Sequence, residues 1–301
     1  MENPTDPIDV GPFDARYSAF LETITQLRPH LHRYCARMTG SVMDGEDVVQ
    51  EALFEAYRKL DKFDEGRPLK PWLFRIAHNR CVDLLRRRGA RNEAEAVAAV
   101  DEAVLPIEPL DLGHALEHLV LTLPPKERSC VLLKDVFDYS LEEIAGMVDS
   151  TVGGVKAALN RARTKLAASA PHANISRSAN PELTRVTQLY VERFNRRDWD
   201  GVRELISADA RLNVADAFAG KVSDAPYFSN WGRWSMPWKL ANGQVDGEPA
   251  VIILQRGPDT WTPYSVVRLS IVGGRVEHIA DYAHCPWVIS HATSIRISDH
   301  H

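Results

Sequence analysis

The chain has 301 residues, enough for two or three domains, and its 36 basic and 41 acidic side chains give a net charge of −5. Ordinary globular composition excludes wholesale disorder, and the lack of an 18-residue apolar run excludes a membrane-spanning helix. Four scattered cysteines without a CxxC pair argue against a disulfide framework or zinc site, so we expect a cytoplasmic protein without metal or cofactor.

Residues 13–88 carry a continuous helical pattern. In Asp44 to Leu60 (DGEDVVQEALFEAYRKL), Val49, Leu53 and Ala56 lie on one stripe that we expect to be buried. The other side is acidic, and it is either a solvated surface or a docking face for a protein partner. The candidate docking residues are Asp44, Glu46, Asp47, Gln50, Glu51 and Glu55. The run HLHRYC, at residues 30–35, is read as a helix surface rather than a metal site.

The helix predicted over Pro71 to Arg88 has an aromatic ring and several cations on its outer side. Such a surface suits single-stranded nucleic acid, because the ring stacks on unpaired bases and the cations follow the backbone. The alternative is that Trp72 packs in the core and that Arg86 to Arg88 only cap the helix. The outer face consists of Trp72, Arg75, Asn79, Arg80, Arg86 and Arg87.

A linker is predicted at residues 89–111, followed by a second helical unit at 112–168. Ser140 and Glu143 have the spacing of a capping box, a short helix follows, and a second helix begins near Thr151. This pattern fits a helix-turn-helix, whose second helix enters the major groove, or an ordinary helical hairpin with a basic face. The candidate DNA contacts are Thr151, Gly153, Lys156, Ala157, Asn160, Arg161 and Arg163.

Together, these segments resemble the extracytoplasmic-function (ECF) RNA polymerase sigma factors. DGEDVVQEALFEAYRKL is similar to the helix of sigma domain 2 that grips the polymerase β′ clamp, and PWLFRIAHNRCVDLLRRR is similar to the −10 recognition helix. The unit ending in SLEEIAGMVDSTVGGVKAALNRARTKL resembles sigma domain 4, which reads the −35 element. The resemblance further implies that the loop Lys62 to Pro68 captures a flipped −10 base, which adds Lys62, Phe63 and Arg67 to the site.

A second linker is predicted at residues 169–181, and residues 182–291 change character. Two helices precede strands expected near Ala250–Gln255, Tyr264–Val272 and Arg275–Tyr282, and Gly273-Gly274 predicts a tight hairpin. Helices followed by a curved antiparallel sheet are similar to the SnoaL-like (nuclear transport factor 2-like) fold, a cone with a pocket. Trp231, Trp234 and Trp238 are expected to line that pocket or to form core.

Asp281 and His284 are a candidate acid–base pair for an enzyme. Pairing across Gly273-Gly274 places Leu269 opposite His278 and puts Asp281 and His284 on opposite sides of the sheet, barring a bulge. Asp281 is then expected to pair with Arg268, and no catalytic residue is predicted.

The sequence therefore predicts a multidomain protein: two all-α sigma domains, the second with a helix-turn-helix, and a C-terminal α+β SnoaL-like domain. We expect an ECF-type sigma factor that binds core RNA polymerase through its β′ clamp and β subunits, binds promoter DNA and does not contact a membrane. The C-terminal domain is expected to contact the sigma domains and modulate their activity. The alternatives are a helix-turn-helix regulator with a ligand-binding C-terminal domain and a pocket enzyme fused to a DNA-binding head.

Overall fold

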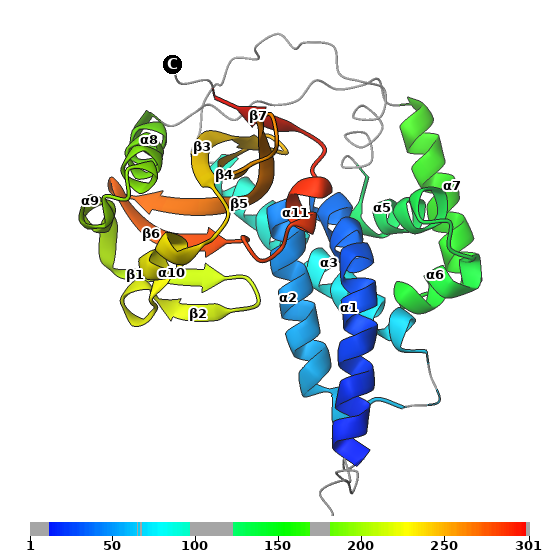
Figure 1. The fold of residues 1–301 in the computed structure, drawn as a ribbon. Coiled ribbons are helices and arrows are strands. Elements are labelled where there is room, and N and C mark those ends of the chain that lie inside the picture. Colours follow the sequence, from blue (N-terminus) through cyan, green and yellow to red (C-terminus); the bar gives the residue numbers. More distant parts are fainter. Residues whose placement is uncertain (1–11, 65, 67, 97–122, 169–180, 299–301) are drawn as a thin grey trace, which may run out of the picture.

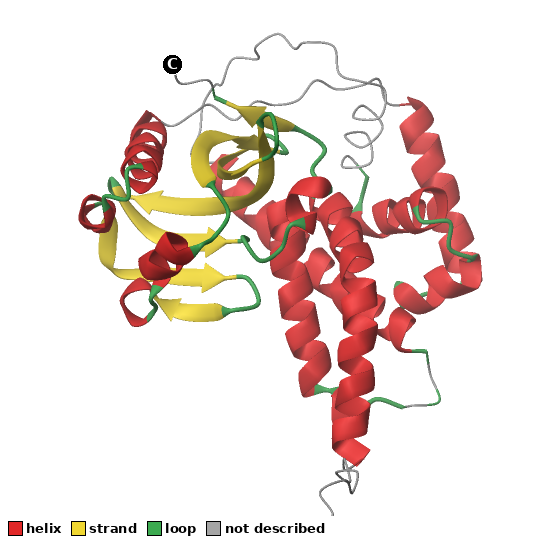
Figure 2. Cartoon of the chain, viewed as in Figure 1, coloured by secondary structure: helices red, strands yellow, loops and turns green. Residues whose placement is uncertain are grey.

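A computed structural model describes residues 12–64, 66, 68–96, 123–168 and 181–298 (Figure 1). The described residues up to 96 form an N-terminal helical unit, and residues 123–168 form a second helical unit (Figure 2). Residues 181–298 form a C-terminal unit of helices around a sheet. The multidomain prediction is confirmed. None of the helices in these ranges is long and apolar enough to span a bilayer.

The N-terminal unit consists of α1 (Pro12–Thr39), α2 (Val42–Arg58), a 3-10 turn (Leu60–Lys62) and α3 (Leu69–Ala96). Ser41 starts α2, because its hydroxyl accepts a hydrogen bond from the Asp44 amide. α1 and α2 cross closely at Gly45, where an added Cβ would lie 2.6 Å from the Ala36 nitrogen. α3 continues to Ala96, past Gly89, where the sequence predicted a linker.

The second helical unit comprises α5 (Pro125–Val131), a π-helical turn (Leu132–Val136), α6 (Leu141–Met147) and α7 (Val152–Ala168). The predicted capping box is present, since Ser140 and Glu143 exchange side-chain and backbone hydrogen bonds at the start of α6. Asp149, between α6 and α7, has φ +51°, the left-handed conformation that a glycine adopts most easily. α6 and α7 therefore form the helix-turn-helix that the sequence predicts.

The two helical units share one hydrophobic core, in which Phe74 of α3 packs against Tyr139, the residue that precedes the α6 cap. The buried Arg128 donates hydrogen bonds to the carbonyl oxygens of Met38 and Leu123, and Lys70 lies 4.4 Å from the Tyr139 ring centre. The second unit is thus packed against α1 and α3.

The C-terminal unit places helices before and within a sheet of seven strands. The helices are α8 (Pro181–Asn195), α9 (Trp199–Glu204), α10 (Tyr227–Arg233), α11 (Trp287–Ser290) and a 3-10 turn (Val222–Asp224). The strands are β1 (Ile206–Val214), β2 (Phe218–Lys221), β3 (Trp238–Val245), β4 (Glu248–Arg256), β5 (Trp261–Val272), β6 (Arg275–Asp281) and β7 (Ile295–Ile297). Their order is β2-β1-β6-β5-β4-β3-β7, with β1 and β6 parallel, so the sheet is mixed rather than wholly antiparallel.

The predicted hairpin is present, but its register is not the expected one. Gly273 and Gly274 have φ +56° and +75° and join β5 to β6. Glu277 of β6 is left without a partner between the pairs Ser270–His278 and Ile271–Val276, which makes a bulge. The bulge shifts the pairing by one residue, so that Val267 lies opposite Asp281 in place of Val266, which the expected register puts there. The expected Leu269–His278 pair is wrong, because Leu269 lies opposite Ile279.

Both faces of this sheet are covered. One face packs on α8, α9 and α10 through residues such as Val251 and Val267. The other face buries Ile252 and Val266 against α1, α2 and α11, in a cluster that includes Val42 of α2 (Figure 1). Because side chains alternate along a strand, the sheet joins the C-terminal helices on one side to the N-terminal helices on the other.

Candidate functional site: a helix face shared with the C-terminal domain

The acidic start of α2 lies against the C-terminal sheet rather than in solvent. Asp44 is 4% exposed, and its carboxylate lies 2.9 Å from Nη1 of Arg268 on β5 and also pairs with Arg88 of α3. Arg268 additionally contacts Glu248 of β4 at 3.0 Å. An arginine fork suits this position, since it can hold several carboxylates at once.

Glu46 is completely buried at the same contact. It pairs with Arg28 of α1 and accepts a hydrogen bond of 2.9 Å from Nε1 of Trp287 on α11. Arg28 also contacts Asp216, 2.8 Å away, in the turn between β1 and β2. Removing one partner from such a buried ionic network costs several kcal/mol, because the remaining charge is left unpaired.

Asp47 completes the acidic row. The Tyr282 hydroxyl donates a 2.9 Å hydrogen bond to it, and Arg268 lies 3.5 Å away. Burial raises the pKa of Asp47 to about 6, although Arg268 and Tyr282 favour its ionised form. The apolar side chains of Val42 and Met43, both 0% exposed, lie beside these carboxylates.

The remaining candidate docking residues lie further along α2 and are more open. Glu51 is exposed, Gln50 is half-buried, and Glu55 pairs with Lys59 and with Arg80 of α3. Phe54 is 63% exposed on this open part of α2, and the sequence reasoning did not select it. The six candidate docking residues therefore fall into a covered group (Asp44, Glu46, Asp47) and an open group (Gln50, Glu51, Glu55).

The candidate −10 surface is only partly free. Trp72 is half-buried and its ring lies 4.6 Å from that of Phe63, so the two aromatic residues of this surface are brought together. Arg75 pairs with Asp149 of the helix-turn-helix at 2.9 Å, and Arg80 pairs with Glu55. Lys62, Asn79, Arg86 and Arg87 are exposed, and Arg67 lies outside the described residues.

The outer face of α7 is open. Thr151, Gly153, Lys156, Ala157, Asn160, Arg161 and Arg163 are all exposed. Lys156, Asn160 and Arg163 line a shallow groove together with Lys134. Arg161 also forms an ion pair within this helical unit. Hydrogen bonds from Lys165 and Arg161 hold the carboxylate of Glu127 on α5 and lower its pKa.

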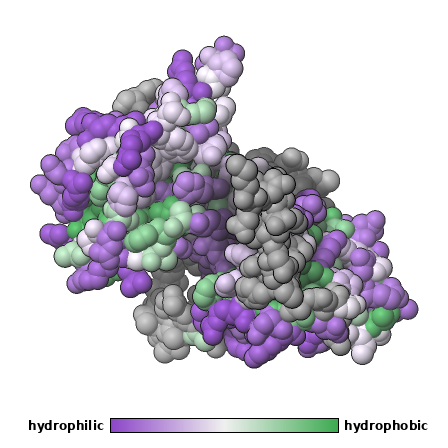
Figure 3. Space-filling model, turned by 60° about the horizontal axis from the view of Figure 1, so that its bottom comes forward, coloured by the Kyte–Doolittle hydropathy of each residue, from purple (hydrophilic) through white to green (hydrophobic). Residues whose placement is uncertain are grey.

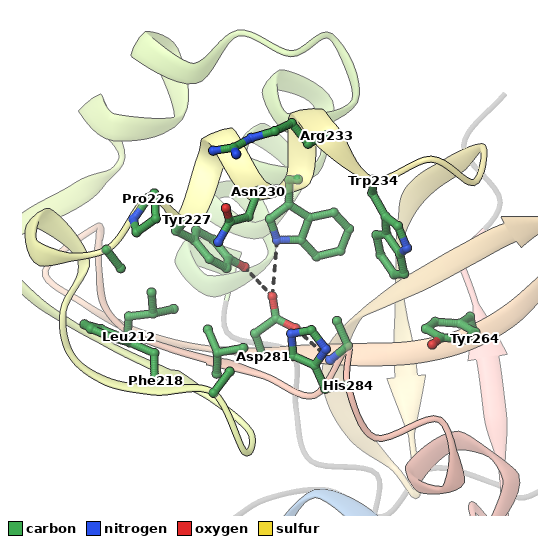
Figure 4. Close-up of a pocket in the computed structure, with 15 residues that line it drawn as sticks. Leu212, Phe218, Pro226, Tyr227, Asn230, Arg233, Trp234, Tyr264, Asp281 and His284 are labelled. Atoms are coloured by element: carbon green, nitrogen blue, oxygen red, sulfur yellow. Dashed lines mark hydrogen bonds between the residues drawn. The ribbon is translucent and has the colours of Figure 1, made fainter. Parts of the chain in front are cut away.

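A separate pocket of about 530 Å³ lies between α10 and the sheet (Figure 4). Asp281 is at its base, where Tyr227 and Trp231 donate hydrogen bonds of 2.7 and 3.3 Å to Oδ2. The expected pairing of Asp281 with Arg268 is therefore wrong.

His284 also lines the pocket, because β6 ends at Asp281 and the alternation of side chains along the strand stops there. The expected separation of Asp281 and His284 on opposite sides of the sheet is therefore wrong as well. Trp231 and Trp234 line the pocket, whereas Trp238 is core.

Several residues of the interface were missed by the sequence reasoning. His32 is fully buried rather than on a surface, with its Nδ1 2.8 Å from Nδ1 of His291 after α11. Tyr282 and Trp287 contact α2 directly. A signal for them existed in the continuous apolar run at residues 250–254 (AVIIL), because a strand with both faces apolar is normally covered on both sides.

Glu46, Asp216 and Cys285 bring ligand atoms within 4.8 Å of one another. Arg28 already pairs with both carboxylates of this group, so its guanidinium supplies the positive charge that a metal ion would bring. Burial raises the pKa of the Cys285 thiol, which further disfavours the thiolate that metals bind. The group is better described as part of the interface.

Comparison with known proteins identifies both helical units. Residues 23–91 match the family Sigma-70 region 2, and residues 113–166 match the family Sigma-70, region 4. The chain is 32% identical over 162 residues to the ECF RNA polymerase sigma factor SigW of Bacillus subtilis, covering 49% of this chain and 87% of SigW. It is 28% identical over 311 residues to the ECF RNA polymerase sigma factor SigG of Mycobacterium tuberculosis, covering 90% of this chain and 83% of SigG. The crystal structure of the M. tuberculosis ECF sigma factor SigJ aligns with a TM-score of 0.34 at 20% identity, covering 89% of this chain and 97% of SigJ.

Proposed function

This chain belongs to the ECF RNA polymerase sigma factors, and from that premise we propose that it delivers core RNA polymerase to a −35/−10 promoter under the control of its own C-terminal domain. The control consists of covering the start of α2, which is the part of the chain proposed to dock on the polymerase β′ clamp. The observation that carries the proposal is the burial of Asp44 and Glu46 against Arg268 and Trp287.

Covering α2 prevents docking for a physical reason. A polymerase surface that binds the carboxylates of Asp44, Glu46 and Asp47 must replace the partners that now hold them. Those partners include Arg268 and Tyr282, which belong to the C-terminal domain. Apolar burial of Val42 and Met43, at about 1.5–3 kcal/mol for each fully buried side chain, adds to the cost of separation.

The promoter contacts are proposed on the faces that remain accessible. Lys156 and Asn160 on α7 would read the −35 duplex in the major groove, with Arg163 on a phosphate. Trp72 and Phe63, with the cations of α3, would hold the opened −10 strand. Arg75 would exchange its exposed ion pair with Asp149 for a contact with the −10 strand, which costs little because both side chains are in solvent.

Co-purification with core polymerase followed by run-off transcription tests this function. We expect the full-length chain to bind core polymerase and to initiate from its promoter, and a chain ending at residue 180 to bind more tightly. The pocket is proposed as a binding site, and no catalytic step is assigned to it. If the full-length chain binds promoter DNA but never core polymerase, a polymerase-independent helix-turn-helix regulator is the better description.

The interface is also expected to weaken as pH falls. Burial lowers the pKa of both His32 and His291 to about 4, so protonating them below pH 6.5 favours the separated form. Asp47 acts in the opposite direction, because its pKa is raised to about 6 in the covered form and its protonation below that pH favours covering. Two histidines outweigh one carboxyl, whose side chain is 38% exposed, so the net effect at pH 4.5 is against covering.

Small-angle scattering at pH 7.5 and pH 4.5 measures this effect as an increase in the radius of gyration at the lower pH. His291→Gln should reduce the response, since it removes one of the two histidine contributions while the opposing contribution of Asp47 remains. His284→Gln is the matched control, because His284 is exposed at the pocket, on the face of the sheet away from His32. An identical scattering curve at both pH values for the unmodified chain would contradict the prediction.

A further inference from the structure

The pocket of the C-terminal domain has the features of a small-molecule site. Its volume of about 530 Å³ lies within the range of about 300–1,000 Å³ that is usual for such sites. The walls are aromatic and apolar, and Figure 4 shows Trp234 and Tyr264 on one side and Phe218 with Leu212 on the other. Arg233 and His284 lie at the exposed rim. On the face shown in Figure 3, which is mostly hydrophilic, hydrophobic surface gathers on the left-hand lobe, the C-terminal domain.

Asp281 supplies the one carboxyl group among the residues that line this pocket, and it is 2% exposed. Its Oδ2 accepts from Tyr227 and Trp231, whereas its Oδ1 accepts, among the described residues, only from the Ala283 amide, at 2.8 Å. A carboxylate oxygen has room for about two hydrogen bonds, so Oδ1 can accept one more. The complementary ligand is therefore a flat, ring-bearing molecule with a hydrogen-bond donor at its inner end.

The segment that forms the base of the pocket also holds α2. Within residues 281–287, which we call the strap, Asp281, Ala283 and His284 line the pocket. Tyr282 and Trp287 point the other way and donate hydrogen bonds of 2.9 Å each to Asp47 and Glu46. The pocket and the proposed polymerase-docking helix are thus contacted by different residues of one short segment.

We propose that the pocket binds a ring-bearing apolar molecule carrying a hydroxyl or amino donor, and that this binding releases α2 through the strap. The inference rests on the proposed function, in which the C-terminal domain covers α2. A ligand donor that takes the second acceptor position of Oδ1 shares this oxygen with the Ala283 amide and so weakens the amide's hydrogen bond, which closes the turn that follows β6. Loosening the turn displaces Tyr282 from Asp47 and Trp287 from Glu46, which uncovers the start of α2.

Coupling of this kind is reciprocal. A ligand shifts the covered–uncovered equilibrium only by the ratio of its affinities for the two forms. If the ligand favours the uncovered form, then any change that uncovers α2 from outside the pocket must raise the affinity for the ligand. Arg268 provides such a change, because it holds Asp44 on the sheet face opposite the pocket.

The binding step is tested on the full-length chain by isothermal titration calorimetry with three naphthalene probes. 2-Naphthol and 2-naphthylmethylamine carry a donor, and 2-methoxynaphthalene has the same ring without one. We expect at least one donor probe to bind saturably and about fivefold or more tightly than the methoxy compound. Comparing the two donor probes distinguishes a hydroxyl ligand from an ammonium ligand.

Asp281→Asn should reduce the preference for donor probes. Ala217→Trp fills the mouth of the pocket and should lower the affinity for all three probes. Equal binding of all probes, or no saturable binding, overturns the ligand class.

The coupling step uses the donor probe that binds best, with hydrogen exchange of α2 and core polymerase affinity as readouts. At saturation we expect exchange at residues 42–50 to rise threefold or more and the apparent Kd for core polymerase to fall by a similar factor. Arg268→Ala should bind the probe more tightly than the unmodified chain. If the probe binds but changes neither readout, while Arg268→Ala changes both, the coupling is refuted and the covering of α2 stands. If Arg268→Ala changes neither readout, the proposed function itself fails.

Discussion

Arg268→Ala is expected to raise the apparent affinity of the full-length chain for core polymerase by roughly 30-fold. The substitution removes the cation that joins Asp44 of α2 to Glu248 of the sheet, without altering any residue proposed to contact polymerase. Breaking a buried ion pair costs about 3–5 kcal/mol. We expect the smaller cost of about 2 kcal/mol for Arg268→Ala, because Arg88 still pairs with Asp44 and Arg268 is partly exposed. A loss of 2 kcal/mol from the covered form shifts its equilibrium by more than tenfold.

Arg275→Ala is the matched control. Arg275 is an exposed arginine on β6 of the same sheet, away from α2, so its loss should leave polymerase affinity unchanged. Both variants should be monitored by thermal unfolding, so that a general loss of stability is recognised. Equal polymerase affinity for Arg268→Ala, Arg275→Ala and the unmodified chain would show that the Asp44–Arg268 contact does not limit docking.

The second large effect is expected at the −35 element. Asn160→Ala should weaken holoenzyme binding to the matched −35 sequence by roughly 5- to 150-fold, corresponding to about 1–3 kcal/mol for one bidentate base contact. Lys156→Ala should weaken binding to all sequences about equally and lower the salt dependence by about one charge. Both residues are exposed on α7, so neither change should disturb folding.

The sequence also predicts reduced transcription for Arg161→Ala, but this variant gives a less direct result. Arg161 lies 2.8 Å from Glu127 of α5, so its loss removes an ion pair within the helix-turn-helix unit as well as a DNA contact. Arg185→Ala on α8 is a suitable charge control, because Arg185 is exposed in the C-terminal unit. Unchanged run-off transcription from both Lys156→Ala and Asn160→Ala would contradict the assignment of α7 as the recognition helix.

Local chemistry made much of this fold predictable. Ser140 and Glu143 mark the start of α6 by their spacing alone, since each satisfies an otherwise unpaired backbone or side-chain group of the other. Gly273 and Gly274 define the hairpin, because they readily adopt the positive φ angles of a two-residue turn. The open face of α7 follows from a 3.6-residue apolar period, which requires Lys156 and Asn160 to face away from the core.

The register of β5 and β6 could not be obtained in the same way. One extra residue in β6, Glu277, moves Asp281 to the face opposite Arg268, and nothing in the local sequence marks Glu277 as the extra residue. The pocket follows from this shift. Asp281 meets Tyr227 and Trp231 only because α10 packs across that particular face of the sheet.

The sequence by itself determined the class of protein, the two helical sigma units, the helix-turn-helix and the acidic character of α2, because each depends on residues within a few turns of one another. Only the tertiary structure decided that the acidic start of α2 is covered. Periodicity shows that a face is apolar or charged, but it does not show which distant segment packs on it. Asp44 and Arg268 are separated by more than 200 residues, and they meet because the second face of the sheet needs an apolar partner and finds it in Val42 and Met43.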